Sequence, residues 1–380
     1  MESDGEFIMA VKYLSGNRLW GTDAERLALT TYTATQNSWK YIDSQKLDGT
    51  DSTIELDFSS GTKQNIMVLI AWARDSGTND PKLQLGGDAI DQTDTVYAQR
   101  GNHNSGTDFK NDSDDDCNFV AKWATGTGSG VRNFEVHTFS NYAGGLKLGE
   151  SISAFGGTTG ADNAPNLLMN VFAYNKTDGQ VGYISYGASD AGYTSNTVFS
   201  DDSEIVILGC DDSTSASADD NFWEELGQYT LTEAGDTIDS GTFTAKKYLW
   251  FEAWTSGDNT EATFRFNNIA TETYASGRDN DGTFDEQIEQ EQAKCNASGD
   301  AQFGTYTIGY VYNVAGQEKM CVTTQIASEG EDGTKPRRAT TATRWVETTN
   351  PITSIQMINM NAGGDFAIGS RIRVWGGSPP

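Results

Sequence analysis

The 380-residue sequence has few of the side chains that usually bind metals or form disulfides. It has two histidines, His103 and His137, and four widely spaced cysteines without a Cys-x-x-Cys pair, at Cys117, Cys210, Cys295 and Cys321. A structural zinc site needs a local set of Cys and His ligands, and a disulfide framework is typical of short secreted chains. The sequence therefore argues against both.

The usual motifs of hydrolases are also missing. There is no Gly-x-Ser-x-Gly elbow, and two histidines give little support to a Ser-His triad. Paired carboxylates could hydrolyse glycosides, but no Glu-x-Asp-x-x-Glu run places them on one strand face, and 54 acidic residues give pairs by chance. His137 lies in an alternating strand pattern, which favours a packed or surface residue over a base. We expect no enzymatic activity.

Basic residues are scarce, because 26 Lys and Arg stand against 54 Asp and Glu, for a net charge of −28 at pH 7. Such a surface repels a phosphate backbone, so nucleic acid is not an expected partner. Salt or bound divalent cations would weaken the repulsion of the chain for itself.

Long apolar runs are absent. No segment could span a bilayer, and residues 1–6 are acidic and lack the apolar core of a secretory signal. We therefore expect synthesis in the cytoplasm without a signal peptide, and Met9 is an alternative start to Met1.

Glycine and aromatic residues, in contrast, are abundant. The chain has 41 glycines against 6 prolines, and 41 aromatic residues (9 Trp, 15 Tyr, 17 Phe). Strand-length segments alternate with turn clusters, and residues 66–72 are apolar on both faces, which predicts a central strand. Convincing helices are nearly absent. The sequence predicts an all-β chain of two tandem β-sandwich or jelly-roll-like domains with short helical turns.

An internal repeat supports this division. Residues 143–157 and 362–377 share Ala-Gly-Gly, a spacer and Gly-x-x-Ile-x-x-aromatic-Gly-Gly, which predicts that each closes a β-domain. Residues 133–136 occupy the place of residues 354–357 in the second copy. Other landmarks recur in order at similar spacing, in the pairs Trp39 and Trp223, Tyr97 and Tyr274, Trp72 and Trp254, and Trp123 and Trp345. We infer two diverged copies of one unit.

The repeat predicts four parts. Residues 1–38 form an N-terminal arm that begins a helical turn at a Thr-x-x-Glu capping box and either docks on a neighbour or packs on its own domain. Residues 39–157 form the first sandwich, 158–212 a joining β-hairpin segment, and 213–380 the second sandwich.

Two details of these parts are more specific. The joining hairpin matches a strand pair at residues 308–322 in the second copy, which suggests that it completes the first sandwich. Residues 285–294 are polar and are predicted to be a short surface helix.

One acidic segment is similar to a calcium loop. Asp279, Asp281 and Asp285 place carboxylate oxygens around a glycine, as calcium ligands are spaced. The match is incomplete, because Gly277 stands where a first Asp belongs and Ile288 where the bidentate Glu belongs. A solvated turn is the alternative interpretation, and it applies also to residues 112–116 and 211–212.

The tryptophans allow a glycan-binding interpretation, because an exposed indole can stack on a sugar ring. Packing explains the recurrence of six of them better, so we predict that the paired tryptophans are core residues. Trp20, Trp250 and Trp375 remain open.

Residues 352–356 and 369–376 of the closing motif, together with residues 15–22, resemble structural proteins of tailed viruses from marine and other aquatic samples. The resemblance covers both β-units and the arm through short motifs. It implies a virion component with sandwich or jelly-roll domains, as a capsid decoration, tail or fibre protein, and it implies no catalytic residue.

The expected function is therefore that of a non-enzymatic virion structural protein. It would form a homo-oligomer and bind other virion proteins through its sheet edges and arm. The alternative is a glycan-binding adhesin or receptor-binding protein that recognises host surface glycans.

Overall fold

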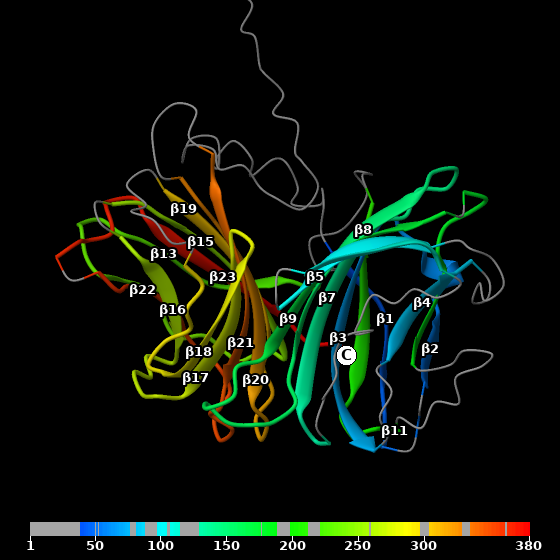
Figure 1. The fold of residues 1–380 in the computed structure, drawn as a ribbon, viewed down its shortest axis with the longest axis horizontal. Helices are drawn as coiled ribbons and strands as arrows, with labels where there is room; N and C mark the ends of the chain where they lie inside the picture. Colours follow the sequence, from blue (N-terminus) through cyan, green and yellow to red (C-terminus); the bar gives the residue numbers. More distant parts are fainter. Residues whose placement is uncertain are drawn as a thin grey trace, which may run out of the picture.

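A computed structural model describes residues 39–49, 51, 53–76, 81–87, 97–104, 107–114, 129–175, 177–187, 198–211, 221–257, 260–296, 304–328, 335–361 and 363–380. This part of the chain is strand apart from turns and one 3-10 segment, η1 (Ser59–Gly61), and none of its helices could cross a membrane. It forms two β-sandwich units side by side (Figure 1). The predicted all-β fold with two sandwiches is confirmed, and the arm at residues 1–38 lies outside the described residues.

The first unit packs a large antiparallel sheet on a small one. The large sheet has the order β1 (Lys40–Lys46), β12 (Glu204–Cys210), β3 (Asn65–Ser76), β7 (Arg132–Ser140), β8 (Lys147–Phe155), β9 (Asn166–Tyr174), β5 (Tyr97–His103), β6 (Thr107–Asp114), and β11 (Val198–Phe199) pairs with β3. The small sheet has the order β2 (Thr53–Asp57), β10 (Tyr183–Gly187), β4 (Lys82–Gly86). Apolar side chains from both sheets, such as Ile70, Trp72 and Ile184, form the core between them.

The second unit repeats this arrangement. Its large sheet has the order β13 (Glu224–Thr230), β23 (Arg371–Gly377), β15 (Tyr248–Thr255), β19 (Thr305–Tyr312), β20 (Lys319–Ala327), β21 (Arg337–Trp345), β17 (Tyr274–Asn280), β18 (Thr283–Gln290). Its small sheet has the order β14 (Thr237–Asp239), β22 (Ile355–Asn359), β16 (Ala262–Phe266). Phe251, Phe264 and Trp345 lie in the core between the two sheets.

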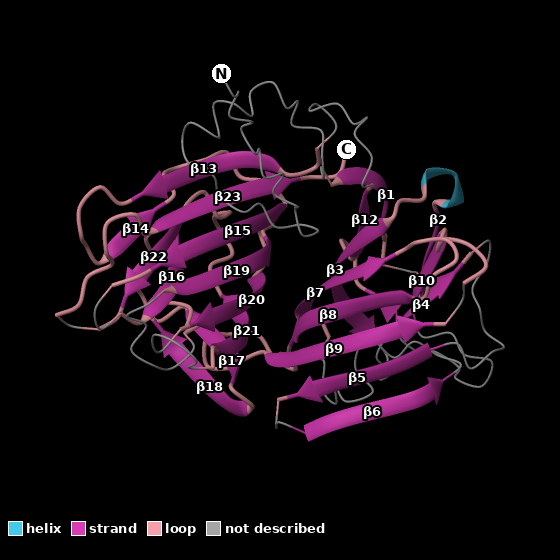
Figure 2. Cartoon of the chain, turned by 90° about the horizontal axis from the view of Figure 1, so that it is seen from above, coloured by secondary structure: helices cyan, strands magenta, loops and turns pink. Residues whose placement is uncertain are grey.

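The two strand orders are the same once the strands are counted along the chain. Strands β1 to β10 correspond one by one to β13 to β22, and β12 corresponds to β23 (Figure 2). Irregular positions correspond as well, because the pairing shifts at Tyr41 in β1 and at Glu225 in β13, and again at Tyr97 in β5 and at Tyr274 in β17. A bulge is a specific local feature, so its recurrence at equivalent positions supports the inferred duplication.

A buried asparagine recurs in the same role in each unit. Asn141 donates from Nδ2 to the carbonyls of Lys63 and Val181, each at 3.0 Å, and accepts from the Val181 amide at 2.6 Å. Asn313 makes the same three bonds with Lys246 and Ile352, at 3.0, 3.0 and 2.6 Å. Each asparagine, placed directly after the end of β7 or β19, therefore ties that end of the strand to two other segments.

These asparagines give a matched test of the repeat. We expect Asn141→Ala and Asn313→Ala each to lower the free energy of unfolding by about 2 to 3 kcal/mol, because each leaves buried backbone groups without partners. Urea unfolding measures both losses, and Asn350→Ala at an exposed turn is the control. A large loss at one position and none at the other would contradict the equivalence.

A buried lysine also recurs, at the start of β8 and β20. Lys147 Nζ donates to the carbonyls of Tyr142, at 3.1 Å, and Gly145, at 3.0 Å, and Lys319 Nζ donates to that of Glu347, at 2.5 Å. Both side chains are almost fully buried. Burial lowers the pKa of Lys147, and it lowers the pKa of Lys319 to about 8. Each lysine is thus held by neutral oxygens inside the protein.

The lowered pKa of Lys319 predicts a pH dependence of stability. In the unfolded chain this lysine keeps its proton to about pH 10, whereas the folded protein releases it near pH 8. Because the unfolded state then binds more protons, stability rises with pH in this window. Between about pH 8 and pH 9.5, we expect the wild type to gain on the order of 1 to 2 kcal/mol relative to Lys319→Met. Urea unfolding along this pH series measures the gain, and a constant difference would contradict the assignment.

The structure corrects the register of the predicted repeat. Residues 143–157 and 362–377 are not equivalent, because β8 lies within the sheet between β7 and β9, whereas β23 lies between β13 and β15. The counterpart of β23 is β12. Residues 133–136 lie in β7 of a large sheet, but residues 355–357 lie in β22 of a small one. Glycine turns followed by alternating strands occur throughout an antiparallel sheet, so this pattern alone cannot identify one strand.

Two local predictions are also wrong. The segment at residues 168–186 is not a hairpin, because β9 belongs to the large sheet and β10 to the small one, and both complete the first unit. Residues 285–294 are not a helix, because β18 pairs with β17. Arg278 on β17 holds the Asp285 carboxylate across the pair with two bonds of 2.8 and 2.9 Å, which favours a strand despite the polar composition.

Candidate functional site

The three predicted calcium ligands lie along the hairpin of β17 and β18, but they are engaged with other partners. Asp279 accepts from the Gly282 amide at 2.9 Å, Asp281 from the Arg338 amide at 2.9 Å, and Asp285 from Arg278. Among the described residues, no group of three or more His, Cys, Asp or Glu side chains could hold a metal. The three carboxylates thus accept hydrogen bonds from the hairpin itself and from the neighbouring strand β21 (Arg337–Trp345).

The described residues of the other acidic segments give no metal site either. Asp211 forms an ion pair with Lys63 at 2.7 Å and accepts from the Gln64 amide at 3.0 Å, while residue 212 and residues 115–116 lie outside the described residues. Residues 112–114 belong to β6.

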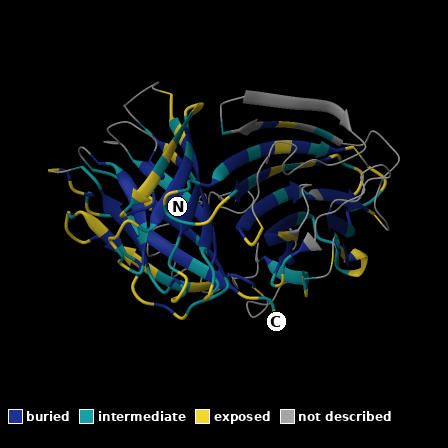
Figure 3. Ribbon diagram, turned by 60° about the horizontal axis from the view of Figure 1, so that its bottom comes forward, coloured by how far each residue is buried: buried dark blue, intermediate teal, exposed yellow. Residues whose placement is uncertain are grey.

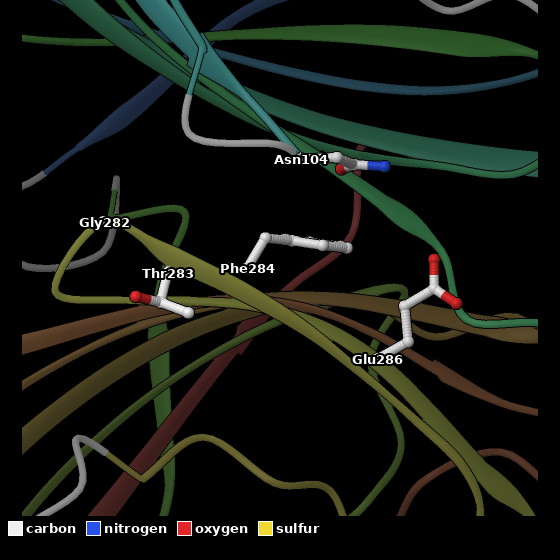
Figure 4. Close-up of a pocket in the computed structure, with 5 residues that line it drawn as sticks. All are labelled: Asn104, Gly282, Thr283, Phe284 and Glu286. Carbon is white, nitrogen blue, oxygen red and sulfur yellow. The ribbon is translucent and has the colours of Figure 1, made fainter.

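The same hairpin borders a hollow at the junction of the two units. This junction hollow has a volume of about 490 Å³ and is lined by Asn104, Gly282, Thr283, Phe284 and Glu286. Figure 4 shows the Phe284 ring below Asn104 and the Glu286 carboxylate pointing to the side where Asn104 lies. Asn104 comes from the first unit and accepts from the Leu167 amide at 2.7 Å. The lining offers hydrogen-bond partners and one ring, without a nucleophile beside a base.

The junction itself is a shared apolar core. The outer faces of the two large sheets, those turned away from the small sheets, pack on each other through β7, β8 and β9 of the first unit and β19, β20 and β21 of the second. The Phe134 ring lies 6.3 Å from the rings of both Tyr248 and Tyr312. Buried strands therefore run through the middle of the molecule (Figure 3), and both faces of each large sheet are covered over part of their area.

A buried arginine connects the units at this junction. Arg344 on β21 is fully buried, donates from Nη1 to the carbonyls of Thr158 and of Asn163, the latter at 3.1 Å, and lies 3.2 Å from the Glu318 carboxylate. Glu318 also accepts from the Gly160 amide of the first unit at 3.0 Å. A Cβ at Gly156 would overlap Arg344 Nη2, so a side chain there would displace the guanidinium. These contacts fix the loop after β8 to the second unit.

A buried carboxylate forms a second connection. Glu204 of the first unit accepts from the Tyr248 hydroxyl at 2.6 Å and pairs with Lys247 at 2.7 Å, both from the second unit. Burial, followed by the nearby Glu204 charge, raises the pKa of Tyr248 well above its usual value. Apolar packing and these polar contacts together make one body of the two units.

His137, predicted to be packed or on the surface, is fully buried inside the first sandwich. Its Nε2 lies 3.0 Å from Glu135, whose other carboxylate oxygen accepts from Trp72 Nε1 and the Tyr186 hydroxyl, each at 2.6 Å. This cluster is enclosed by the core, so its role is structural.

The tryptophans divide differently from the prediction. Trp39, Trp72, Trp223 and Trp345 are buried, but Trp254 is 36% exposed, so the prediction that it is a core residue is wrong. Sheet register explains the error. Gly209 of β12 pairs with Ile66 of β3, and in the equivalent strands Gly376 of β23 pairs with Leu249 of β15. Counting five residues on from Ile66 and from Leu249 makes Trp254 equivalent to Ala71 and not to Trp72. Trp20 and Trp123 lie outside the described residues.

Trp250 and Trp375 stack at 4.7 Å between ring centroids, at the edge of the junction core. The cysteines that the structure describes, Cys210, Cys295 and Cys321, are buried and form no disulfide, and burial raises the pKa of Cys295 to about 12. Cys117 lies outside the described residues.

Comparisons with known proteins identify no family. No family model matches the chain, and no curated protein matches it. One aligned solved structure is Ail, the attachment invasion locus protein of Yersinia pestis, at 6% identity over 75% of this chain and 99% of that chain, with a TM-score of 0.13. Another is the outer membrane protein OprG from Pseudomonas aeruginosa, at 7% identity over 83% and 98%, with a TM-score of 0.10. Scores this low carry no argument about function.

Proposed function

We propose that this chain is a non-enzymatic structural protein of a virus particle, a capsid decoration, tail or fibre component that assembles through its β-units. The observation that supports this most is the junction, where two sandwiches of one topology share a buried core and a buried arginine. A component of a particle needs such a fixed shape. The short motifs that resemble structural proteins of tailed viruses support the same proposal.

The sheet edges are suited to assembly. In the described part of the chain, β6 and β18 each pair on one side only, as the last strands of their sheets. An open edge can receive a strand from a second copy or from another virion protein. We therefore propose a homo-oligomer whose contacts include these edges.

The proposal is tested on the source particle and on the purified chain. Antibodies against the chain should label intact particles in electron micrographs at a regular position. The purified chain should elute from a size-exclusion column as a defined oligomer, with its mass measured by light scattering. A chain that is absent from purified particles and stays monomeric at all concentrations would refute the proposal.

A further inference from the structure

Five side chains form a line across the outer face of the second unit's large sheet. Direct cross-strand neighbours join Arg371 to Trp254, Trp254 to Tyr306, Tyr306 to Ile326, and Ile326 to Arg338. We call this set the outer row. The inward-facing neighbours on these strands, such as Ala253 and Ile372, belong to the sandwich core, so the row faces away from it.

The outer row lies outside the junction core. Trp254 is 36% and Ile326 47% exposed, and the Arg338 side chain is 53% exposed. The equivalent line in the first unit, also joined by direct pairs, is buried at the junction and consists of Glu204, Ala71, Phe134, Ala154 and Leu167. The same positions thus carry Glu204 and four small or apolar residues where they pack, and Arg, Trp, Tyr, Ile and Arg where they are partly or fully exposed.

The centre of the row is held in place by neighbours on the same face of the sheet. Tyr306 donates a hydrogen bond to Glu252, a buried residue on the neighbouring strand, and burial followed by the Glu252 charge raises the pKa of Tyr306. The Trp254 indole also lies close to Gly304. A Cβ added at Gly304 would be 3.4 Å from the indole Nε1. A ring that is partly fixed before binding loses less conformational entropy when a ligand stacks on it.

The two ends of the row are positively charged, whereas the chain as a whole is negatively charged. Arg371 and Arg338 bracket the aromatic centre, in a protein with a net charge of −28. Arg338 lies 4.0 Å from the Asp279 carboxylate, and Glu252 lies close enough to Arg371 to interact with its charge. Four strand spacings separate them, or about 19 Å between the two backbone positions. A guanidinium can hold a carboxylate or sulfate with two parallel hydrogen bonds.

We propose that the outer row binds an acidic oligosaccharide that lies across the strands, and this goes beyond the proposed structural role. Trp254 and Tyr306 would stack on sugar rings, and the two arginines would bind carboxylate or sulfate groups of the chain. The strand spacing is close to the repeat of linked pyranose rings, so successive sugars can lie over successive strands.

A saccharide fits this surface better than a protein does. A stable protein interface buries about 800 Å² on each partner around an apolar centre, and here the exposed apolar residues form one line. Beside that line the residues are polar as well, with Thr324 partly exposed and Glu252, Thr340 and Arg373 buried.

The test compares oligogalacturonate with a neutral cello-oligosaccharide of equal length, by isothermal titration calorimetry on the full chain. We expect the acidic probe to bind and the neutral probe to bind weakly. Trp254→Ala should weaken binding of the acidic probe at least about tenfold. Arg338→Gln should weaken it several-fold and reduce its salt dependence.

Tyr229→Ala, at an exposed tyrosine on β13 outside the row, is the matched control and should bind as the wild type does. Thermal unfolding shows whether each variant is folded, and Arg338→Gln, at an exposed site, tests the row even if Trp254→Ala is unstable. The proposal is overturned if neither probe binds, if both bind equally, or if Arg338→Gln and a folded Trp254→Ala bind as the wild type does. A change of oligomeric state in these variants, without saccharide binding, would identify a protein contact instead. Particle labelling is independent of these outcomes.

Discussion

Arg344→Ala is expected to lower the free energy of unfolding by about 3 to 5 kcal/mol. The substitution removes the hydrogen bonds to Thr158 and Asn163 and leaves Glu318, whose carboxylate is largely buried, without its cation. The loss should be accompanied by separation of the units, because Arg344 fixes a loop of the first unit to a strand of the second. Urea unfolding followed by tryptophan fluorescence measures the stability, and limited proteolysis at the junction measures the separation.

Arg338→Ala is the matched control, because it removes an arginine from the same strand and the same face, at an exposed position. Its effect should stay within about 0.5 kcal/mol. Similar losses for the two variants would show that Arg344 acts through the general charge of β21 and not as a connection between units.

Glu135→Ala is expected to lower the free energy of unfolding by about 3 to 5 kcal/mol, independently of Arg344. The reason is that Trp72, Tyr186 and His137 would each lose a buried acceptor. Glu135→Gln keeps one acceptor oxygen and should cost about half as much. Thermal and urea unfolding measure both losses.

Glu55→Ala provides the control for this pair of variants. Glu55 also accepts from a tyrosine hydroxyl, that of Tyr183 at 2.8 Å, but on the exposed face of the small sheet. Little change is expected there. If Glu135→Ala were as mild as Glu55→Ala, the enclosed cluster would have no part in stabilising the first sandwich.

Strand patterns in the sequence predicted the fold class because an antiparallel sandwich depends on local alternation and glycine turns. Residues 66–72 are apolar on both faces, and β3 indeed lies in the middle of a large sheet, covered on one side by the small sheet and on the other by the second unit. The order in which strands pair is not a local property. The similar residues 143–157 and 362–377 therefore suggest equivalent strands, although they form β8 and β23.

The candidate sites depend on the register in which the strands pair, and this register cannot be derived from local sequence patterns. A shift of one residue turns a side chain to the other face of a strand. Spacing in the sequence matches Trp254 with the buried Trp72, whereas the register places it on the outer face. One signal was available in β19, where Tyr306, Ile308, Tyr310 and Tyr312 alternate with the smaller Thr, Gly and Val and thus mark a face rich in large side chains. The polar composition of residues 285–294 favours a surface helix in the sequence, and the cross-strand arginine that favours a strand could be identified only from the pairing of β17 with β18.

In each unit the first and last strands of the fold are neighbours at one edge of the large sheet, β1 beside β12 and β13 beside β23. The polypeptide therefore enters and leaves a sandwich at the same place. Tandem multiplication of the gene segment requires only a brief connection, such as residues 211–223 between β12 and β13 here, and no loop has to thread through a finished domain. Longer arrays of the same module, or permuted versions with new ends, are accessible to evolution and to protein engineering by this route.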